Sequence, residues 1–385
     1  MGNALHFKRG AFFLYMIAGE LTDYIESWSP PGAAWEKDNT GLQIGSRGTK
    51  IKNIMLCLEL TDEVLKEAIN KNCNFIFTHH PLLFNPVYKL DFEFNSTAKL
   101  IEKIIRNNVT VYSAHTNLDF AKDGVSFELA KKLKLTEIKF LQNLESNQFK
   151  IAVFVPETHL EQVSNAVFSS GAGIIGEYEN CSFRLKGEGT FKGSEKSNPV
   201  IGKKNIFEKV EEIRLEFIVD QWNLNKVISS MIKAHPYEEP AYDIYPLKNR
   251  NVNFGAGAIG ILKNEMSEEE FLRYVSNLLN TEVLRYCNGK NKVIKKVAVC
   301  GGAGSNLISH AINSNADAFI TADIKYHEFH QANNKILLID AGHYETEVLI
   351  LNEVKKRIEE LISNRSKIKV YKYTKTTNPI KFYKH

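Results

Sequence analysis

The stretch IKNIMLCLELTDEVLKEAINKNCNFIFTHH, at residues 51–80, decides the fold. Residues 51–60 form an apolar run typical of a buried strand, and residues 61–72 have the apolar spacing of a helix that begins near Thr61 or Asp62. A second apolar run, FIFT, ends at two adjacent histidines. A strand, a helix and a second strand in this order predict part of a parallel sheet that is covered by helices.

The same alternation continues downstream and returns near the C-terminus. A helix pattern at 96–108 leads into a strand pattern at 109–115. In the last third of the chain, strand patterns lie in KKVAVCGG (295–302), DAFITAD (317–323) and KILLIDAG (335–342), with helices expected from about Ser305, Tyr326 and Glu345. The segment KVYKYTK could add a last strand. The predicted fold class is therefore α/β, with helices on the faces of the sheets.

Between these parts, at roughly 137–255, the pattern changes. Two segments there each have the pattern strand, helix, strand, and a Gly- and Lys-rich segment, LKGEGTFKGSEKSNPVIGKKN, joins them and is expected to be a loop. This doubling predicts an inserted α+β domain of the ferredoxin-like or PII-like kind. The expected organisation is an N-terminal extension at 1–15, an α/β domain in two parts at 16–136 and 256–385, and the insert at 137–255.

The composition is that of an ordinary globular protein, with 43% hydrophobic and 24% charged residues. The net charge of +4 is mild and gives no reason to expect nucleic-acid binding. The apolar run AFFLYMIAG is far shorter than the roughly 20 residues that a membrane span needs, so we expect none. The five cysteines are scattered without a C-x-x-C pair, which indicates reduced thiols and a cytoplasmic location. No motif for a Ser or Cys nucleophile is present.

Histidines and carboxylates follow the predicted strands at three places in the chain. The residues are His79, His80, His115, Asp119, His343 and Glu347. In open α/β sheets, ligands collect at the carboxyl ends of the strands, where these residues are expected. His343 and Glu347 also have the spacing that places two side chains on one face of a helix.

Imidazole and carboxylate together suit Zn, Mn, Fe, Co or Ni, and a carboxylate can bridge two ions. A single histidine more often caps a strand or packs in a polar pocket. The whole set at successive strand ends favours a metal site instead. We therefore predict a centre for two divalent metal ions.

Several separated motifs resemble those of the type-2 GTP cyclohydrolase homologue family, the NIF-three-like dinuclear-metal proteins. The motifs are WEKDNTGLQIG (35–45), THHP (78–81), SAHTNLD (113–119), ADIKYHE (322–328) and GHYETE (342–347). They occur in order, and the resemblance covers nearly the whole chain from about Met16. The central segments CSFRLKGEGTF and AHPYEEPAYDIY look like those of the longer family members, which carry an inserted PII-like domain.

The resemblance implies two metal ions held by His79, His80, Asp119, His343 and Glu347, with Glu347 as the bridging ligand. It also implies a ring-like homohexamer built from trimers, and a nucleotide such as GTP as a possible substrate. His115 could be a ligand, a proton shuttle or, as we expect, a residue that supports a ligand by hydrogen bonding. Asp323 and His327 are the candidate catalytic acid–base residues, although a helix-end carboxylate and a surface histidine would look the same.

Two further motifs leave alternatives open. CGGAGSN (300–306) could cradle a phosphate, but it matches no phosphate-binding motif, and a tight, closely packed turn is the preferred interpretation. AHPYEEP contains His235, Glu238 and Glu239, which could form a third metal site, although a subunit contact or a solvated turn is preferred.

Two functions from different classes follow. The first is a metal-dependent hydrolase in which an activated water attacks a nucleotide or related substrate. The second is a non-catalytic metal-binding protein with a regulatory or interaction role. Catalytic metals keep an open coordination position, so solvent access to the site distinguishes the two.

Overall fold

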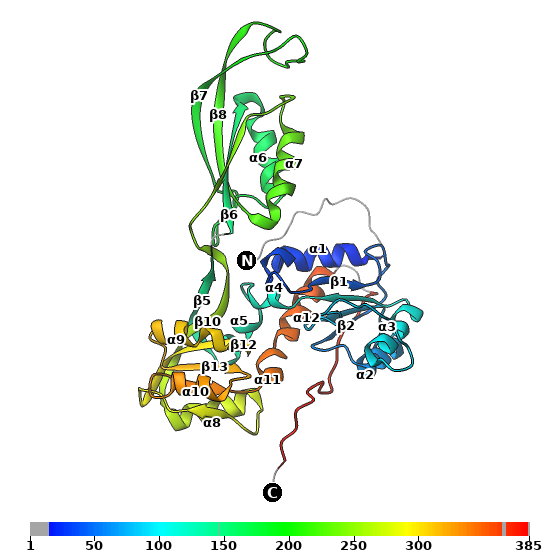
Figure 1. The fold of residues 1–385 in the computed structure, drawn as a ribbon, viewed down its shortest axis with the longest axis vertical. Coiled ribbons are helices and arrows are strands. Elements are labelled where there is room, and N and C mark those ends of the chain that lie inside the picture. The colour runs from blue at the N-terminus through cyan, green and yellow to red at the C-terminus, as the bar shows by residue number, and fades with distance from the viewer. Residues whose placement is uncertain (1–14, 146, 364–366, 384–385) are drawn as a thin grey trace. The chain divides into compact units, whose positions relative to one another are not determined.

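The computed structural model describes residues 15–145, 147–363 and 367–383. The chain forms two compact units, which we call the core unit (residues up to 141 and from 257) and the inserted unit (142–256). Both are drawn in Figure 1. The predicted extension at 1–15 lies outside the described residues except for Tyr15. Within the described part, no helix is long and apolar enough to cross a membrane.

The first sheet of the core unit has five strands, mostly parallel. In spatial order they are β1 (Gly41–Ile44), β4 (Thr110–Ser113), β3 (Phe75–Thr78), β2 (Ile54–Cys57) and β15 (Val370–Lys372). Only β1 runs antiparallel to its neighbour. The strands β2, β3 and β4 are buried along their whole length, as expected for a sheet that is covered on both faces.

Alternate residues of these strands enter two different cores. Phe75 and Phe77 pack in a core with α1 (Ala18–Trp28) and α12 (Ile350–Leu361). Ile76, between them, packs in another core with α2 (Asp62–Asn70) and α3 (Ser96–Arg106). Because successive side chains point to opposite faces of the sheet and both faces are buried, apolar residues follow one another along these strands, which explains the unbroken apolar runs in the sequence.

The second sheet of the core unit has six strands and is assembled mainly from the C-terminal part. In spatial order they are β11 (Arg285–Cys287), β14 (Leu337–Asp340), β13 (Ala318–Ala322), β12 (Val293–Ala303), β10 (Asn251–Ser267) and β5 (Leu135–Leu144). Strands β12, β13 and β14 are parallel, while β10 is antiparallel to β12 and β11 is antiparallel to β14. Its helices are α5 (Val125–Lys132), α8 (Glu268–Leu279), α9 (Ile308–Asn313) and α10 (Tyr326–Ala332).

Two very short helices follow strand ends and carry site residues. Helix α4 (Thr116–Asp119) comes after β4, and α11 (His343–Glu347) comes after β14. The turn before α11 contains Gly342 with a φ of 90°, a backbone conformation that favours glycine. The strand ends of the two sheets are therefore extended by single helical turns that present polar side chains.

The inserted unit is an antiparallel sheet with two helices. Its elements are, in chain order, β6 (Gln148–Pro156), α6 (Leu160–Ser169), β7 (Ser182–Lys192), β8 (Phe207–Asp220), α7 (Leu224–Ala234) and β9 (Tyr242–Pro246). The spatial order is β7-β8-β6-β9. An element order of β-α-β-β-α-β is that of a ferredoxin-like unit. The finer PII-like assignment stays a prediction.

One expectation for this unit is wrong. The segment LKGEGTFK, expected to begin a loop, lies within β7, which pairs with β8 from Ser182 to Lys192. Its glycines are tolerated because β7 is an edge strand and is exposed along most of its length, so few side chains there need to pack.

The units divide at 142 and 256, compared with the expected boundaries at 137 and 255. The difference arises because β5 continues past 137 as a regular strand, and no composition change marks the residue at which it leaves the core unit.

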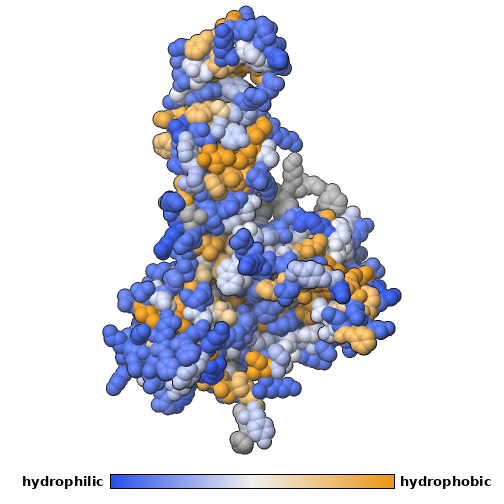
Figure 2. All heavy atoms as spheres, in the orientation of Figure 1, coloured by the Kyte–Doolittle hydropathy of each residue, from blue (hydrophilic) through white to orange (hydrophobic). Residues whose placement is uncertain are grey.

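The visible face of the molecule is mixed, with apolar side chains scattered among hydrophilic ones (Figure 2).

Candidate metal centre

The structure brings all five predicted metal ligands together in the core unit. His79 and His80 follow β3 directly, Asp119 ends α4, and His343 and Glu347 stand at the two ends of α11. These residues come from both sheets of the core unit. The cluster therefore depends on packing between parts of the chain that are far apart in sequence.

Glu347 lies at the centre of the cluster and is 3% exposed. Its Oε2 is 2.9 Å from His80 Nε2, and its Oε1 is 3.1 Å from His343 Nε2. His79 Nε2 is 3.9 Å from Oε2 of the same carboxylate. One carboxylate thus faces three imidazoles, with Oε1 directed to His343 and Oε2 to His80 and His79.

Three buried polar atoms of the cluster have no hydrogen-bond partner: His79 Nε2, Asp119 Oδ1 and Glu347 Oε2. The first two are 3.5 Å apart, and the short contact of Glu347 Oε2 with His80 lacks hydrogen-bond geometry. Leaving a buried polar group unsatisfied costs about 1–3 kcal/mol. Three such atoms around one point fit metal ions, which would take up their lone pairs.

Each histidine of the cluster is held through Nδ1. The partners of Nδ1 are the Ala114 carbonyl for His79 (2.8 Å), Glu59 for His80 (3.0 Å), Asp38 for His115 (2.9 Å) and Asp323 for His343 (2.6 Å). Metal-binding histidines usually donate their second ring nitrogen to a carboxylate or carbonyl in this way, which orients the ring. The Nε2 atoms are thereby left for the centre.

His115 belongs to the cluster itself. Two groups of residues have ligand atoms close enough to share an ion: His79 with His80 and His115, and His80 with His343 and Glu347. Asp38 accepts hydrogen bonds from His115 and Thr116, which outweigh the effect of burial and lower the pKa of Asp38 to about 2. This placement favours His115 as a direct ligand over the supporting role expected from the sequence.

The charges of the cluster are strongly coupled. Burial opposes protonation of His80, but contacts with Glu347 and Glu59 raise the pKa of His80 to about 10. For His343, burial is likewise outweighed by Glu347 and Asp323, which raise its pKa to about 9. Burial and the Glu347 charge raise the pKa of Asp119 well above its usual value. Without metal, protons on the imidazoles balance the central carboxylate.

The two predicted acid–base residues are placed differently. Asp323 contacts His343 Nδ1 and adopts a φ of 56°, which is uncommon for a residue other than glycine. This carboxylate therefore positions a ligand. His327 is exposed on α10 and makes a ring contact with Tyr326, and no contact with the cluster is found among the described residues.

The CGGAGSN turn forms part of the wall of the cluster. A Cβ added at Gly302, whose φ is 62°, would overlap Glu347 Oε1 and come within 3.2 Å of His343 Nε2. The Gly302 amide donates to Thr346 Oγ1 at 3.0 Å. The turn is therefore closely packed, as preferred from the sequence, and this amide is not available to a phosphate.

The alternative third metal site is not formed. His235 Nε2 lies 2.9 Å from the Phe154 carbonyl, and its Nδ1 accepts from the Tyr237 amide. Both ring nitrogens are used by the backbone, and His235, Glu238 and Glu239 do not make a metal group among the described residues.

Sequence reasoning did not find two of the carboxylates that hold the histidines, Glu59 and Asp38. Glu59 follows β2, and the carboxyl end of that strand lies beside that of β3, so its position was a usable signal. Asp38 lies within the quoted WEKDNTGLQIG motif, but nothing in its local pattern indicated His115 as its partner, which is 77 residues away.

The chain is similar to proteins of one known family. The Duf34/NIF3 (NGG1p interacting factor 3) family model matches residues 16–379. A protein from Halalkalibacterium halodurans named GTP cyclohydrolase 1 type 2 homolog is 40% identical over 336 residues, which cover 87% of this chain and 90% of that protein. A Bacillus subtilis protein of the same name is 39% identical over 332 residues, covering 86% of this chain and 89% of that protein.

A solved structure shares the fold. A Bacillus cereus protein related to NIF3 superposes with a TM-score of 0.81 at 36% identity, covering 96% of this chain and 99% of that one. The matched region includes both parts of the core unit and hence every residue of the cluster. The chain therefore belongs to the Duf34/NIF3 family.

Proposed function

We propose that this protein is a metal-dependent hydrolase with two divalent cations at the cluster. The ligands would be His79, His80, Asp119, His343 and Glu347, together with His115. The observation that carries the proposal is the set of three buried, unpartnered polar atoms surrounded by four Nδ1-anchored imidazoles. A cluster that only stabilised the fold would pair those atoms within the protein.

When bound, two divalent cations supply Lewis-acid activation of a water molecule and of the group that it attacks. The protein's own part is to hold the six ligands rigidly and to keep one side accessible. His79 is fully buried, whereas the side chains of His80, Asp119 and His343 are 23%, 23% and 33% exposed. This partial exposure favours the enzyme over the closed site of a regulatory metal protein.

The substrate we propose is a nucleotide, with GTP as the first candidate. It rests on the name of the relatives, GTP cyclohydrolase 1 type 2 homolog, and on the hydrolytic chemistry that such a centre supports. Phosphoester or amide hydrolysis would use the same ligands, so these substrates belong in the same screen. Asp323 would position His343, and proton transfer by His327 stays a prediction.

The decisive experiment measures metal content by inductively coupled plasma mass spectrometry. Protein purified without added metal, or reloaded with Zn, Mn, Fe, Co or Ni, is expected to hold about two ions per chain. The Glu347→Gln and His79→Ala variants should lose them. Glu345→Gln is the matched control, because Glu345 lies on the same helix but is held by Asn378 at 3.0 Å, away from the cluster.

The activity screen follows from the metal measurement. Loaded protein should hydrolyse at least one nucleotide or phosphoester, and Glu347→Gln should abolish that turnover while Glu345→Gln retains it. A loaded protein inactive on the whole screen would favour the regulatory alternative. Failure of the metal-free protein to take up any of these ions would overturn both the hydrolase proposal and the regulatory metal-binding alternative.

We also propose a cytoplasmic homohexamer, as the family resemblance implies. Exposed apolar side chains on the inserted unit support self-association: Phe183 and Leu185 on β7 are 63% and 55% exposed, and Phe207 on β8 is 61% exposed. Light scattering coupled to size-exclusion chromatography should give a mass near six times 43.8 kDa. A monomeric mass at micromolar concentration would contradict the hexamer.

A further inference from the structure

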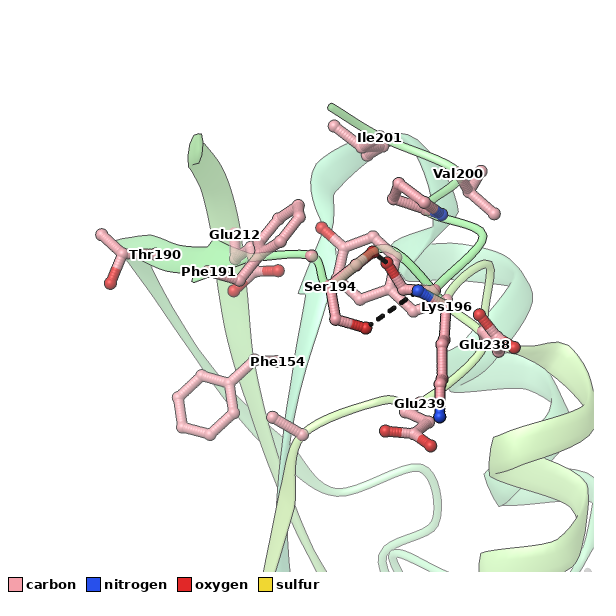
Figure 3. Close-up of a pocket in the computed structure, with 15 residues that line it drawn as sticks. Phe154, Thr190, Phe191, Ser194, Lys196, Val200, Ile201, Glu212, Glu238 and Glu239 are labelled. Carbon is pink, nitrogen blue, oxygen red and sulfur yellow. Dashed lines mark hydrogen bonds between the residues drawn. The ribbon is translucent and has the colours of Figure 1, made fainter. Parts of the chain in front are cut away.

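The inserted unit contains a pocket of about 410 Å³ that the metal centre does not involve. It lies between the end of β7, the segment 193–201 and the turn that follows α7 (Figure 3). Small-molecule sites usually have volumes of about 300–1,000 Å³ and combine apolar walls with a few polar groups. This pocket has the size and the mixed lining of such a site.

Aromatic side chains form one wall. The rings of Phe191 and Tyr237 are 6.1 Å apart, and Tyr237 also stacks edge-on against His235 at 5.0 Å. The His235 ring is fixed by the Phe154 carbonyl, and the Phe154 side chain itself lines the pocket. The backbone-anchored His235 ring supports Tyr237 from behind, and such preorganisation lowers the entropy cost of binding.

The polar lining is predominantly acidic. Three carboxylates, Glu212, Glu238 and Glu239, face the pocket with one ammonium, Lys196. In Figure 3, Lys196 extends toward Glu239 and Glu238 at one end, whereas Glu212 lies beside Phe191 at the other. Glu238 also accepts a hydrogen bond from the Asn198 amide at 3.1 Å. None of the three carboxylates forms an ion pair in the described part of the chain, and Glu212 is the one that lies beside the aromatic wall.

The surroundings of Glu212 fit a positive charge. The Tyr237 hydroxyl is shielded from solvent and makes no hydrogen bond of good geometry in the described structure, and burial together with the Glu212 carboxylate raises the pKa of Tyr237. Gly189 leaves space for the carboxylate, because a Cβ there would overlap Glu212 Oε2. A carboxylate beside aromatic rings attracts a cation through both its charge and the ring faces.

We propose that this pocket binds an organic cation: a protonated amine carried on an apolar or aromatic body. The ammonium would pair with Glu212, and the body would lie against Phe154 and Phe191. The excess of carboxylates disfavours phosphates and other anions. A metal ion is disfavoured too, because the described residues offer no metal group here.

The test uses full-length protein and matched probes of one shape and different charge. Isothermal titration calorimetry compares phenethylamine with 2-phenylethanol and 3-phenylpropionate, and 3-methylbutylamine with its alcohol. At least one amine should bind at least about tenfold more tightly than its alcohol, because a charged hydrogen bond to a partly buried carboxylate contributes roughly that factor. The propionate should bind most weakly of the probes.

Variants assign the binding to this pocket. Glu212→Gln should weaken amine binding by about tenfold or more, and Phe191→Ala should also weaken it. Glu211 is adjacent to Glu212 but lies on the opposite face of β8, so the Glu211→Gln variant should bind the amine as tightly as the unsubstituted protein does. Glu347→Gln should also bind normally, which separates this site from the metal centre. Unchanged thermal denaturation verifies that each variant is folded.

Three outcomes would overturn the proposal. The first is that neither amine binds more tightly than its alcohol, which would leave an apolar pocket without charge selectivity. The second is that the propionate binds best. The third is that amine affinity survives in folded Glu212→Gln, or is lost equally in Glu211→Gln, which would place the cation elsewhere.

Discussion

Gly302 shows how a single missing side chain shapes the proposed metal centre. Its backbone passes so close to the cluster that an added Cβ would overlap Glu347 Oε1, and its φ of 62° is itself unfavourable for other residues. The space in which the central carboxylate lies therefore exists because residue 302 has no side chain.

We predict that Gly302→Ala lowers the metal content below one ion per chain and destabilises the protein by about 1–3 kcal/mol, from strain and overpacking. Metal analysis and chemical denaturation measure the two effects. Gly48→Ala is the control, because its Cβ would meet nothing closer than 3.7 Å and its backbone is unstrained. Full metal content in Gly302→Ala would show that Glu347 can move without loss of the site.

The histidine pKa values predict how pH affects the metal-free protein. The pKa of His80 is about 10 and that of His343 about 9, against 6.5 for an unperturbed histidine. A raised pKa in the folded state contributes stability that is fully present below pH 6.5 and is lost as the pH rises through 9–10. The Tm of protein from which metal has been removed with a chelator should therefore fall as the pH is raised from 7 to 10.

The affinity for metal ions is expected to have the opposite pH dependence, because each Nε2 atom can bind either a proton or a metal ion. Metal affinity should rise over this range, with protons released on binding, as calorimetry in buffers of different ionisation enthalpy would detect. In Glu347→Gln the alkaline loss of Tm should be much smaller. An equal loss in that variant would assign the effect to other groups.

At the scale of elements, α11 is fixed to the end of β12 by one buried hydroxyl. Thr346 Oγ1 accepts from the Gly302 amide at 3.0 Å and lies 2.9 Å from the Gly342 carbonyl. Thr346 is fully buried, so water cannot replace these bonds. The helix that carries His343 and Glu347 is thus oriented by a contact with another strand.

We predict that Thr346→Val, of nearly equal shape, destabilises the protein by about 1–3 kcal/mol, because it leaves the Gly302 amide unsatisfied. Metal affinity should fall as α11 loses its anchor. Thr346→Ser keeps the hydroxyl and should retain metal affinity at a smaller cost in stability. Equal losses in Val and Ser variants would show that the methyl packing matters and the hydroxyl does not. Denaturation curves and competitive chelator titrations distinguish these results.

Among the strands, some could be predicted from the sequence and others could not. The strands β2 and β3 were predictable because both faces are buried, which leaves continuous apolar runs. β7 was not, since an exposed edge strand needs no apolar pattern and its glycines imitate a loop. The five predicted ligands followed from strand ends, but the carboxylates that hold them depend on which strands become neighbours. That pairing is set by contacts between distant segments, which local patterns do not encode.

At the scale of the whole molecule, the chain leaves and re-enters the core unit at one place. Strands β5 and β10 are neighbours at the edge of the six-stranded sheet, and a Cβ at Gly257 would lie only 3.3 Å from Leu141 Cβ. The inserted unit has its own core, formed around Ile151, Val153 and Leu215. A short connection could therefore replace residues 142–256 without moving the core unit.

We predict that replacing residues 142–256 by a short Gly/Ser linker leaves the metal content unchanged and abolishes amine binding. The joined ends are adjacent, so the added loop entropy is small. Metal analysis and calorimetry on the shortened protein provide the test. A soluble, folded deletion protein without metal would mean that the inserted unit supports the centre.

The metal centre draws its ligands from both ends of the chain, and this has a consequence for biosynthesis. His79, His80 and Asp119 leave the ribosome well before β12, β14 and α11 have been made. Because translation proceeds from the N-terminus, the nascent chain exposes these residues and His115, four of the six proposed ligands, for many seconds. Glu347, which joins the two halves, arrives near the end. We therefore expect metal loading at the proposed centre only when translation is almost complete, so that a prematurely terminated product would carry no finished site.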